Sequence, residues 1–203
     1  MSFIITLVLF LQLTTVPFLG HFQPNNTLSY TKQYAKGYVY HDENENLSMD
    51  NNEIGIPDVF VSNGVEIVKT DKDGRYKIPV SDDAIVFVIK PRNWMTPIND
   101  LNLPQFYYIH KPNGSPTNFT FKGVDATGPL PKNINFPLYA ENGKSNFKMI
   151  VFGDPQPYSL EEVDFFSENI VSELVGIKGV EFGMTMGDIV GDNLDLLEPI
   201  NQA

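Results

Sequence analysis

Two strand-like segments, each followed directly by Gly-Asp, flank a helix-like segment near the C-terminal end of the sequence. Residues 147–152 and residues 180–186 are rich in apolar side chains and have the length of strands. Between them, Ser159 and Glu162 form an S-x-x-E pattern that predicts the start of a helix. A strand, a helix and a second strand in this order predict a β-α-β unit with two parallel strands.

The segment after Ser159 has one apolar face at helical spacing. The positions on this face are Val163, Phe166, Ile170, Val171, Leu174 and Val175. Such spacing predicts an amphipathic helix. We expect Gly176 and Gly179 to end it.

The two Gly-Asp pairs predict a cation site. Ligands bind at the carboxyl ends of parallel strands, and Asp154 and Asp188 each follow a predicted strand. Neighbouring strands lie about 5 Å apart, so the two carboxylates could share one cation or bridge two. Gln156 would add an amide oxygen, and Asp192 follows in the next loop. Each residue alone is more typical of a turn or a helix cap, but the matched pair favours a site for hard cations such as Mn²⁺, Mg²⁺, Fe²⁺ or Ca²⁺.

Residues 36–90 predict a separate β domain. Residues 56–61 and 65–70 are rich in β-branched side chains and flank Asn63-Gly64, a dipeptide typical of a hairpin turn. Residues 85–89 are all apolar, which predicts a strand that is buried on both faces or paired centrally. Short strands separated by glycine turns predict an all-β sandwich of immunoglobulin-like type, followed by an α/β segment at residues 146–203.

The remaining ranges predict export and connection. Residues 1–22 contain an apolar run that is too short to span a bilayer and is typical of a signal peptide. An uncleaved anchor or a buried strand is the alternative. We expect residues 23–35 to be a linker and residues 91–145 to be an irregular connecting segment. The predicted location is therefore the periplasm, the outer surface or the extracellular space, with no stable transmembrane segment after signal cleavage.

Charge and cysteine content exclude several classes of function. Lys and Arg number 14 against 25 Asp and Glu, so the formal net charge is −11. A nucleic-acid partner is not expected, because such proteins normally have a basic face. The chain has no cysteine, which excludes disulfides, thiolate zinc sites and cysteine nucleophiles.

Residues 42–53 have the register of a calcium-binding loop. Oxygen-bearing side chains stand at positions 1, 3, 5, 9 and 12 of this segment, namely Asp42, Asn44, Asn46, Asp50 and Glu53. These are the ligand positions of an EF-hand loop. Position 6, which favours glycine, is Leu47, and strands rather than helices are expected to flank the loop. A solvated acidic hairpin loop is the alternative interpretation.

Three sequence blocks resemble the calcineurin-like metallophosphoesterases. Residues 152–156 read Phe-Gly-Asp-Pro-Gln and residues 186–193 read Met-Gly-Asp-Ile-Val-Gly-Asp-Asn, and both are similar to the first two signature blocks of that family. The branch with Asp-Pro-Gln in place of Asp-x-His also has an N-terminal β-sandwich and a stretch that resembles residues 103–115. The resemblance covers most of the chain after the predicted signal peptide.

The resemblance implies a two-metal phosphoester hydrolase with a four-layer α/β/β/α domain. Asp154 would bind the first metal, and Asp188 would bridge both, so these two are the candidate catalytic residues. Gln156 would occupy the position of a metal-binding histidine, and Asp192 would be a loop residue. The implied cofactors are two divalent ions, Mn, Fe, Mg or Zn, and the implied substrate is a small-molecule phosphomonoester or phosphodiester.

The later blocks of that family are absent from the sequence. Neither Gly-Asn-His-[Asp/Glu] nor Gly-His-x-His occurs, and the only histidines, His21, His41 and His110, all precede Asp154. We therefore expect the chain to be an incomplete, inactive piece of a longer hydrolase. The alternative hypothesis is a non-catalytic, cell-surface or carbohydrate-associated binding module in which the β-sandwich is the functional part.

Overall fold

The computed structural model describes residues 33–203. The predicted signal peptide, and all of the predicted linker except its last residues, lie outside this range. Within the described range, no helix combines the length and the apolar character that crossing a membrane requires.

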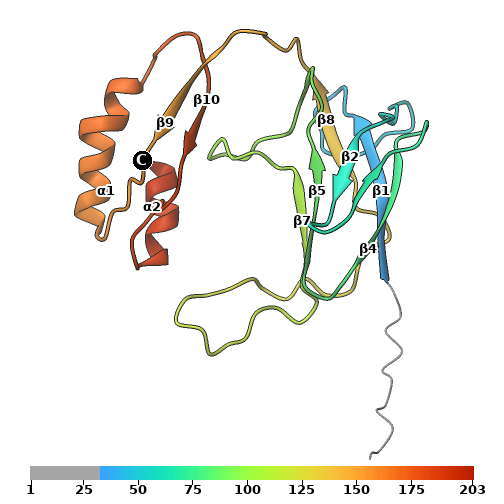
Figure 1. Cartoon of the computed structure of the whole chain (residues 1–203), viewed down its shortest axis with the longest axis horizontal. Helices are drawn as coiled ribbons and strands as arrows, with labels where there is room; N and C mark the ends of the chain where they lie inside the picture. The colour runs from blue at the N-terminus through green and yellow to red at the C-terminus, as the bar shows by residue number, and fades with distance from the viewer. Residues whose placement is uncertain (1–32) are drawn as a thin grey trace, which may run out of the picture. The chain divides into compact units, whose positions relative to one another are not determined.

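A four-stranded sheet is built around β1 (Gln33–His41). Strand β4 (Arg75–Val80) pairs with β1 in antiparallel fashion on one side, and β8 (Phe136–Ala140) pairs with it in parallel fashion on the other. The short strand β6 (Trp94–Met95) continues the sheet beyond β8. Figure 1 shows β1 and β4 side by side in blue and green.

A second four-stranded sheet is antiparallel throughout. Its order is β3 (Ile67–Lys69), β2 (Phe60–Ser62), β5 (Ala84–Ile89) and β7 (Tyr107–His110). Strand β5 is paired centrally, which is one of the two arrangements predicted for this apolar run, and it is not buried on both faces. Val86 and Val88 are buried, whereas the alternate residues Ile85 and Ile89 are 48% and 40% exposed. One face of the sheet therefore covers the core and the other does not.

The two sheets enclose one apolar core, so residues 33–140 form a β-sandwich. Both sheets contribute buried side chains: Ala35, Val39, Ile78, Phe136 and Leu138 from the first, and Val61, Val86 and Val88 from the second. The Tyr76 ring stacks on Phe136 with centroids 5.9 Å apart. Its hydroxyl donates a 2.7 Å hydrogen bond to the Ile134 carbonyl, which fixes the segment leading into β8.

Three strands of the sandwich lie beyond Lys90, where the sequence predicts a connecting segment. Strands β6, β7 and β8 all fall within residues 91–145. The parallel pairing of β8 with β1 joins residues nearly a hundred positions apart, and no local pattern in this proline-rich stretch announces it. Gly37 makes the pairing possible, because a Cβ atom there would lie 1.8 Å from the Ile134 carbonyl oxygen.

Residues 148–202 contain a parallel strand pair and short helices, drawn in orange and red in Figure 1. The elements are β9 (Lys148–Phe152), α1 (Leu160–Phe166), a π-turn (Ser167–Val171), a 3₁₀ turn (Ser172–Leu174), β10 (Val180–Thr185), a second 3₁₀ turn (Leu194–Leu196) and α2 (Leu197–Gln202). The Ser159 hydroxyl caps α1 by accepting from the Glu162 N–H. The predicted N-cap is thus present, while the Glu162 carboxylate accepts from the Tyr158 N–H, one residue before the N–H that a capping box uses.

The α-helix ends earlier than the apolar spacing predicts. Regular α-helical geometry stops at Phe166, and of the predicted apolar face only Val163 is buried. The Ser172 hydroxyl donates to the Glu168 carbonyl, and such back-bonding commonly bends a helix. The apolar surface available to α1 is small, since its cluster contains only Val190, Leu196 and Ile200 besides Val163.

A candidate metal site at the ends of β9 and β10

Three backbone hydrogen bonds align the loops that follow β9 and β10. The Met186 N–H donates to the Phe152 carbonyl at 2.9 Å, and the Gln156 N–H donates to the Asp188 carbonyl at 3.0 Å. Further along, the Gly191 N–H donates to the Pro157 carbonyl at 2.9 Å. The parallel pairing therefore continues beyond the strands, and it brings the two Gly-Asp pairs to the same edge.

The predicted ligands Asp154, Gln156 and Asp188 meet at this edge. The Gln156 amide Nε2 donates to Asp188 Oδ2 at 2.9 Å. The Asp154 Oδ1 atom lies 3.1 Å from the point where a Cβ atom on Gly187 would stand. Glycine at position 187, with its φ of +149°, leaves the space beside this carboxylate open. Gln156 and Asp188 are thus in contact, and Asp154 lies against Gly187, the residue before Asp188.

All three candidate ligands have left-handed backbone geometry. The φ angles are +40° at Asp154, +43° at Gln156 and +28° at Asp188. Residues other than glycine rarely adopt φ angles in this range. Each such residue costs about 1–3 kcal/mol of folding free energy. Strained residues of this kind are typical of ligand-binding and active sites, where the surrounding structure holds them in place.

The donor set fits one side of a hard-cation site. Carboxylate and amide oxygens suit Mg²⁺ and Mn²⁺, and Gln156 fixes the orientation of Asp188 as an outer hydrogen-bond partner of a metal ligand would. Within residues 33–203, no three histidine, cysteine or carboxylate side chains come close enough to hold a metal ion. The described residues therefore supply fewer donors than two cations need. The carboxylates of residues 42–53, in the predicted calcium loop, are likewise not placed to hold one cation.

Neighbouring residues shape the site without adding ligands. Asn193 accepts from the Asp195 N–H and caps the following 3₁₀ turn, while Asp192 is exposed. The Tyr158 ring packs over Gly191 so closely that a Cβ atom there would lie 2.5 Å from it. A cavity of about 540 Å³ lies beside these residues, lined by the Pro155–Tyr158 loop and by Phe165 and Phe166 of α1. Sequence reasoning missed this role for Tyr158, because the contact depends on the fold.

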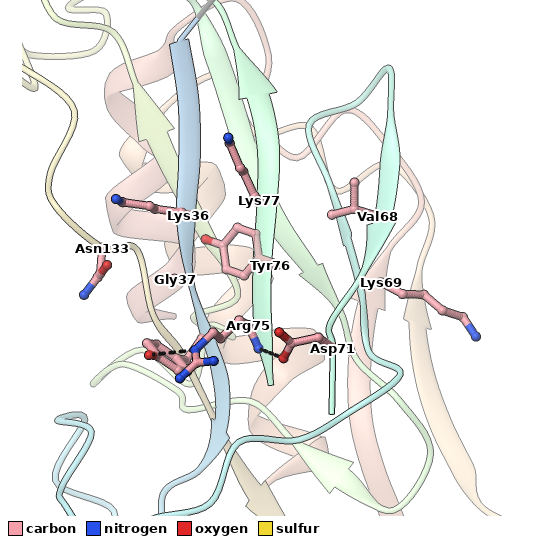
Figure 2. Close-up of a pocket in the computed structure, with 10 residues that line it drawn as sticks. Lys36, Gly37, Val68, Lys69, Asp71, Arg75, Tyr76, Lys77 and Asn133 are labelled. Atoms are coloured by element: carbon pink, nitrogen blue, oxygen red, sulfur yellow. Dashed lines mark hydrogen bonds between the residues drawn. The ribbon is translucent and has the colours of Figure 1, made fainter. Parts of the chain in front are cut away.

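A basic groove on the sandwich is a second hollow that sequence reasoning missed. Figure 2 shows its lining, which comes from β1, β3 and β4 and encloses about 450 Å³. Four cationic residues are among its lining, namely Lys36, Lys69, Arg75 and Lys77, and two of them are ion-paired, Lys69 with Asp58 and Arg75 with Asp73. Arg75 is held in place, since its Nε donates to the Tyr38 hydroxyl at 3.1 Å and its backbone N–H donates to Asp71 at 2.9 Å. The cations come from three strands, with Arg75 and Lys77 both on β4, so only strand pairing places them on one groove.

A family comparison identifies the β domain. Residues 43–125 match the family described as the N terminal of calcineurin-like phosphoesterase. Residues 43–125 belong to the N-terminal domain of the calcineurin-like phosphoesterases. This match agrees with the family resemblance seen in the sequence, and it covers residues of the sandwich rather than Asp154 and Asp188.

The other comparisons do not extend the assignment beyond this calcineurin-like N-terminal domain. No curated protein matches the chain. Among solved structures, the crystal structure of the major plantain pollen allergen Pla l 1 is similar at 16% identity and a TM-score of 0.30, over 55% of this chain and 97% of that chain. A TM-score of this size does not establish a common fold.

Proposed function

We propose that the protein containing this chain is a metal-dependent phosphoester hydrolase, with residues 146–203 as the first part of its catalytic domain. The observation that carries the proposal is the meeting of Asp154, Gln156 and Asp188, all in left-handed conformations, at the carboxyl ends of two parallel strands. The match of the preceding domain to the calcineurin-like phosphoesterases supports it.

The residues in the chain have distinct roles in this proposal. Asp154 and Asp188 would hold the divalent cations, while Gln156 orients the Asp188 carboxylate through its amide N–H. The bound cations, Mn, Fe, Mg or Zn, would polarise the phosphoryl oxygens and lower the pKa of a metal-bound water. The open side of Asp154, kept free by Gly187, is where a small-molecule phosphoester would approach. The remaining ligands would come from outside the described residues.

The test is a hydrolysis assay of the complete gene product with Mn²⁺ and bis(p-nitrophenyl) phosphate. Asp188→Asn removes the bridging charge, and we expect kcat/KM to fall by about 100-fold or more, since metal ions commonly contribute several kcal/mol of charge stabilisation. Asp164→Asn is the matched control, because this exposed carboxylate on α1 lies outside the site and should leave the rate unchanged. Equal activity of Asp188→Asn and the parent protein would contradict the assignment.

A binding module is the second candidate function, and the basic groove favours it. The protein carries a formal charge of −11, yet the lining of the groove includes four cationic residues beside Tyr38. Tyrosine rings and cationic side chains together suit an anionic carbohydrate. Titration of the full chain with a uronic-acid oligosaccharide, compared with Lys36→Ala, tests this function. Binding that Lys36→Ala weakens, in a complete gene product without hydrolase activity, would favour the module over the enzyme.

A further inference from the structure

An open apolar groove lies along the outer face of the second sheet and the chain that follows β8. Its volume is about 1050 Å³, and it shares no lining residue with the basic groove or with the cavity beside Tyr158. Small-molecule sites in proteins commonly have volumes of about 300–1,000 Å³ and are lined mainly by apolar side chains. We therefore asked which ligand the lining of this apolar groove would recognise.

The apolar part of the lining begins on the sheet face that does not cover the core. Phe87 and Ile89 line the groove and alternate along β5 with its two buried valines, so their side chains point away from the core. Met95 and Ile98 continue the lining in the segment after β5, and they are 40% and 53% exposed. Clustered apolar side chains that remain exposed are typical of an interaction site.

The segment after β8 forms another wall of the groove, and contacts fix its position. The Glu141 N–H donates to the Asn93 carbonyl at 2.9 Å, and a Cβ atom on Gly143 would lie 2.9 Å from the Asn93 Oδ1 atom. Further along the chain, the rings of Phe147 and Phe182 meet with centroids 5.7 Å apart, and both residues belong to the lining. The walls of the groove are therefore held by specific contacts.

Two cationic residues of the lining have no carboxylate partner. Lys90 Nζ donates to the Trp94 carbonyl at 2.6 Å, and Arg92 Nη2 donates to the Ser145 hydroxyl at 3.2 Å. Neither Lys90 nor Arg92 takes part in an ion pair formed within residues 33–203. Because these acceptors are neutral, both positive charges remain available to an anionic group.

The carboxylates of the lining leave it with a net positive charge. Glu181 pairs with Lys144, which is the third cationic residue of the lining, and Glu141 is exposed. The groove thus has three cationic residues against two carboxylates, in a chain whose formal net charge is −11. A positive charge beside clustered apolar side chains complements a ligand that is apolar along its length and anionic at one end.

We propose that the apolar groove binds an amphiphile with a long apolar chain and an anionic head, either a fatty-acid carboxylate or an alkyl phosphate. The chain of the ligand packs against Met95, Ile98 and Phe182. The head pairs with Arg92, because a planar guanidinium donates two parallel hydrogen bonds to a carboxylate or a phosphate. No residue of the groove belongs to the proposed metal site, so this proposal does not depend on the hydrolase activity.

The test is equilibrium dialysis of the full chain against radiolabelled dodecanoate and dodecyl phosphate, each below its micelle concentration. We expect saturable binding, and the tighter ligand identifies the preferred head. Decanoate should bind about 10–20-fold more weakly than dodecanoate, because two fewer methylenes are buried. Dodecyl maltoside, which has the same chain and a neutral head, should bind at least about tenfold more weakly. No binding, or equal affinity for the neutral amphiphile, would overturn the proposal.

Variants locate the ligand in the groove. Arg92→Gln should weaken dodecanoate binding about tenfold or more, because a hydrogen bond between two charged groups is lost. Lys132→Gln is its control, since this exposed cationic residue lies outside the groove. Ile98→Asp places a carboxylate against the apolar chain and should weaken binding by a similar factor, whereas Ile67→Asp, exposed on β3 outside the groove, should not. Binding that survives both Arg92→Gln and Ile98→Asp would refute the assignment.

Discussion

Strained residues concentrate in the two segments for which the sequence predicts cation ligands. The non-glycine residues with positive φ in these two segments are Glu45, Leu47, Asp154, Gln156 and Asp188. In each segment, polar side chains meet because the backbone turns sharply at these positions. Glycine or asparagine at these positions would adopt the positive φ angles with less backbone strain. Except at Leu47, the strained residues carry a carboxylate or an amide, which links backbone strain to ligand placement.

Replacement of Asp154 by glycine should separate strain from function. Glycine adopts a φ near +40° freely, so the free energy of unfolding should rise by about 0.5–1 kcal/mol after the entropy cost of glycine is subtracted. Metal-dependent activity of the complete gene product should be lost. Urea unfolding measures the first effect. The control Asp164→Gly, in the regular helix α1, should instead lower stability by a few tenths of a kcal/mol, about what helix propensity predicts. A less stable Asp154→Gly protein would refute the strain argument.

At the scale of elements, β1 connects the two regions of interest in the sandwich. It pairs with β4 and β8, contributes Lys36 and Tyr38 to the basic groove, and ends at the loop that begins with Asp42. The Tyr76 hydroxyl, which bonds to the Ile134 carbonyl, reinforces this arrangement from β4. The hydrogen bond ties β4 to the segment entering β8, on the opposite side of β1.

The buried Tyr76 should make stability fall at alkaline pH. Burial raises the pKa of its phenol above the ordinary value near 10. The folded chain therefore keeps the proton while the unfolded chain loses it, so the contribution is complete below about pH 10 and is lost as pH rises above it. Tyr76→Phe should lower the free energy of unfolding by about 1 kcal/mol at pH 7, because one buried hydrogen bond is lost. Between pH 9 and 11, the range set by the tyrosine pKa, the stability of the variant should fall less steeply than that of the parent chain. Urea unfolding across that range is the measurement, and parallel curves would contradict it.

Local signals predicted local structure, and pairing over long distances escaped them. The Asn63-Gly64 turn, with Gly64 at a φ of +85°, and the Ser159 cap were readable because turn and cap chemistry involves adjacent residues. Strand β8 was not, because its partner β1 lies nearly a hundred residues earlier. The same rule holds for the sites. Asp154 and Asp188 could be placed from the strand ends that precede them, whereas the basic groove depends on tertiary packing.

Over the whole molecule, burial is uneven along the chain. The sandwich has an extensive apolar core, whereas β9 and β10 contain no buried residue. Met149, Val151, Phe182 and Met184 are 38–49% exposed. Parallel strands are normally covered on both faces, and a two-stranded sheet has little stability by itself. The β9–β10 pair therefore has the exposed apolar surface of a sheet that further structure would cover, as the proposed catalytic domain requires.

Hydrogen exchange should expose this difference directly. Amides of β1 and β5 open only when the sandwich unfolds, whereas amides of β9 and β10 can open locally, because few apolar contacts oppose it. We expect protection in β1 and β5 to exceed that in β9 and β10 by about 100-fold or more, a ratio that corresponds to a stability difference of roughly 3 kcal/mol. Exchange of the full chain followed by mass spectrometry of peptides from each strand is the measurement. Equal protection would mean that β9 and β10 are held as firmly as the sandwich, and that their exposed apolar faces need no further partner.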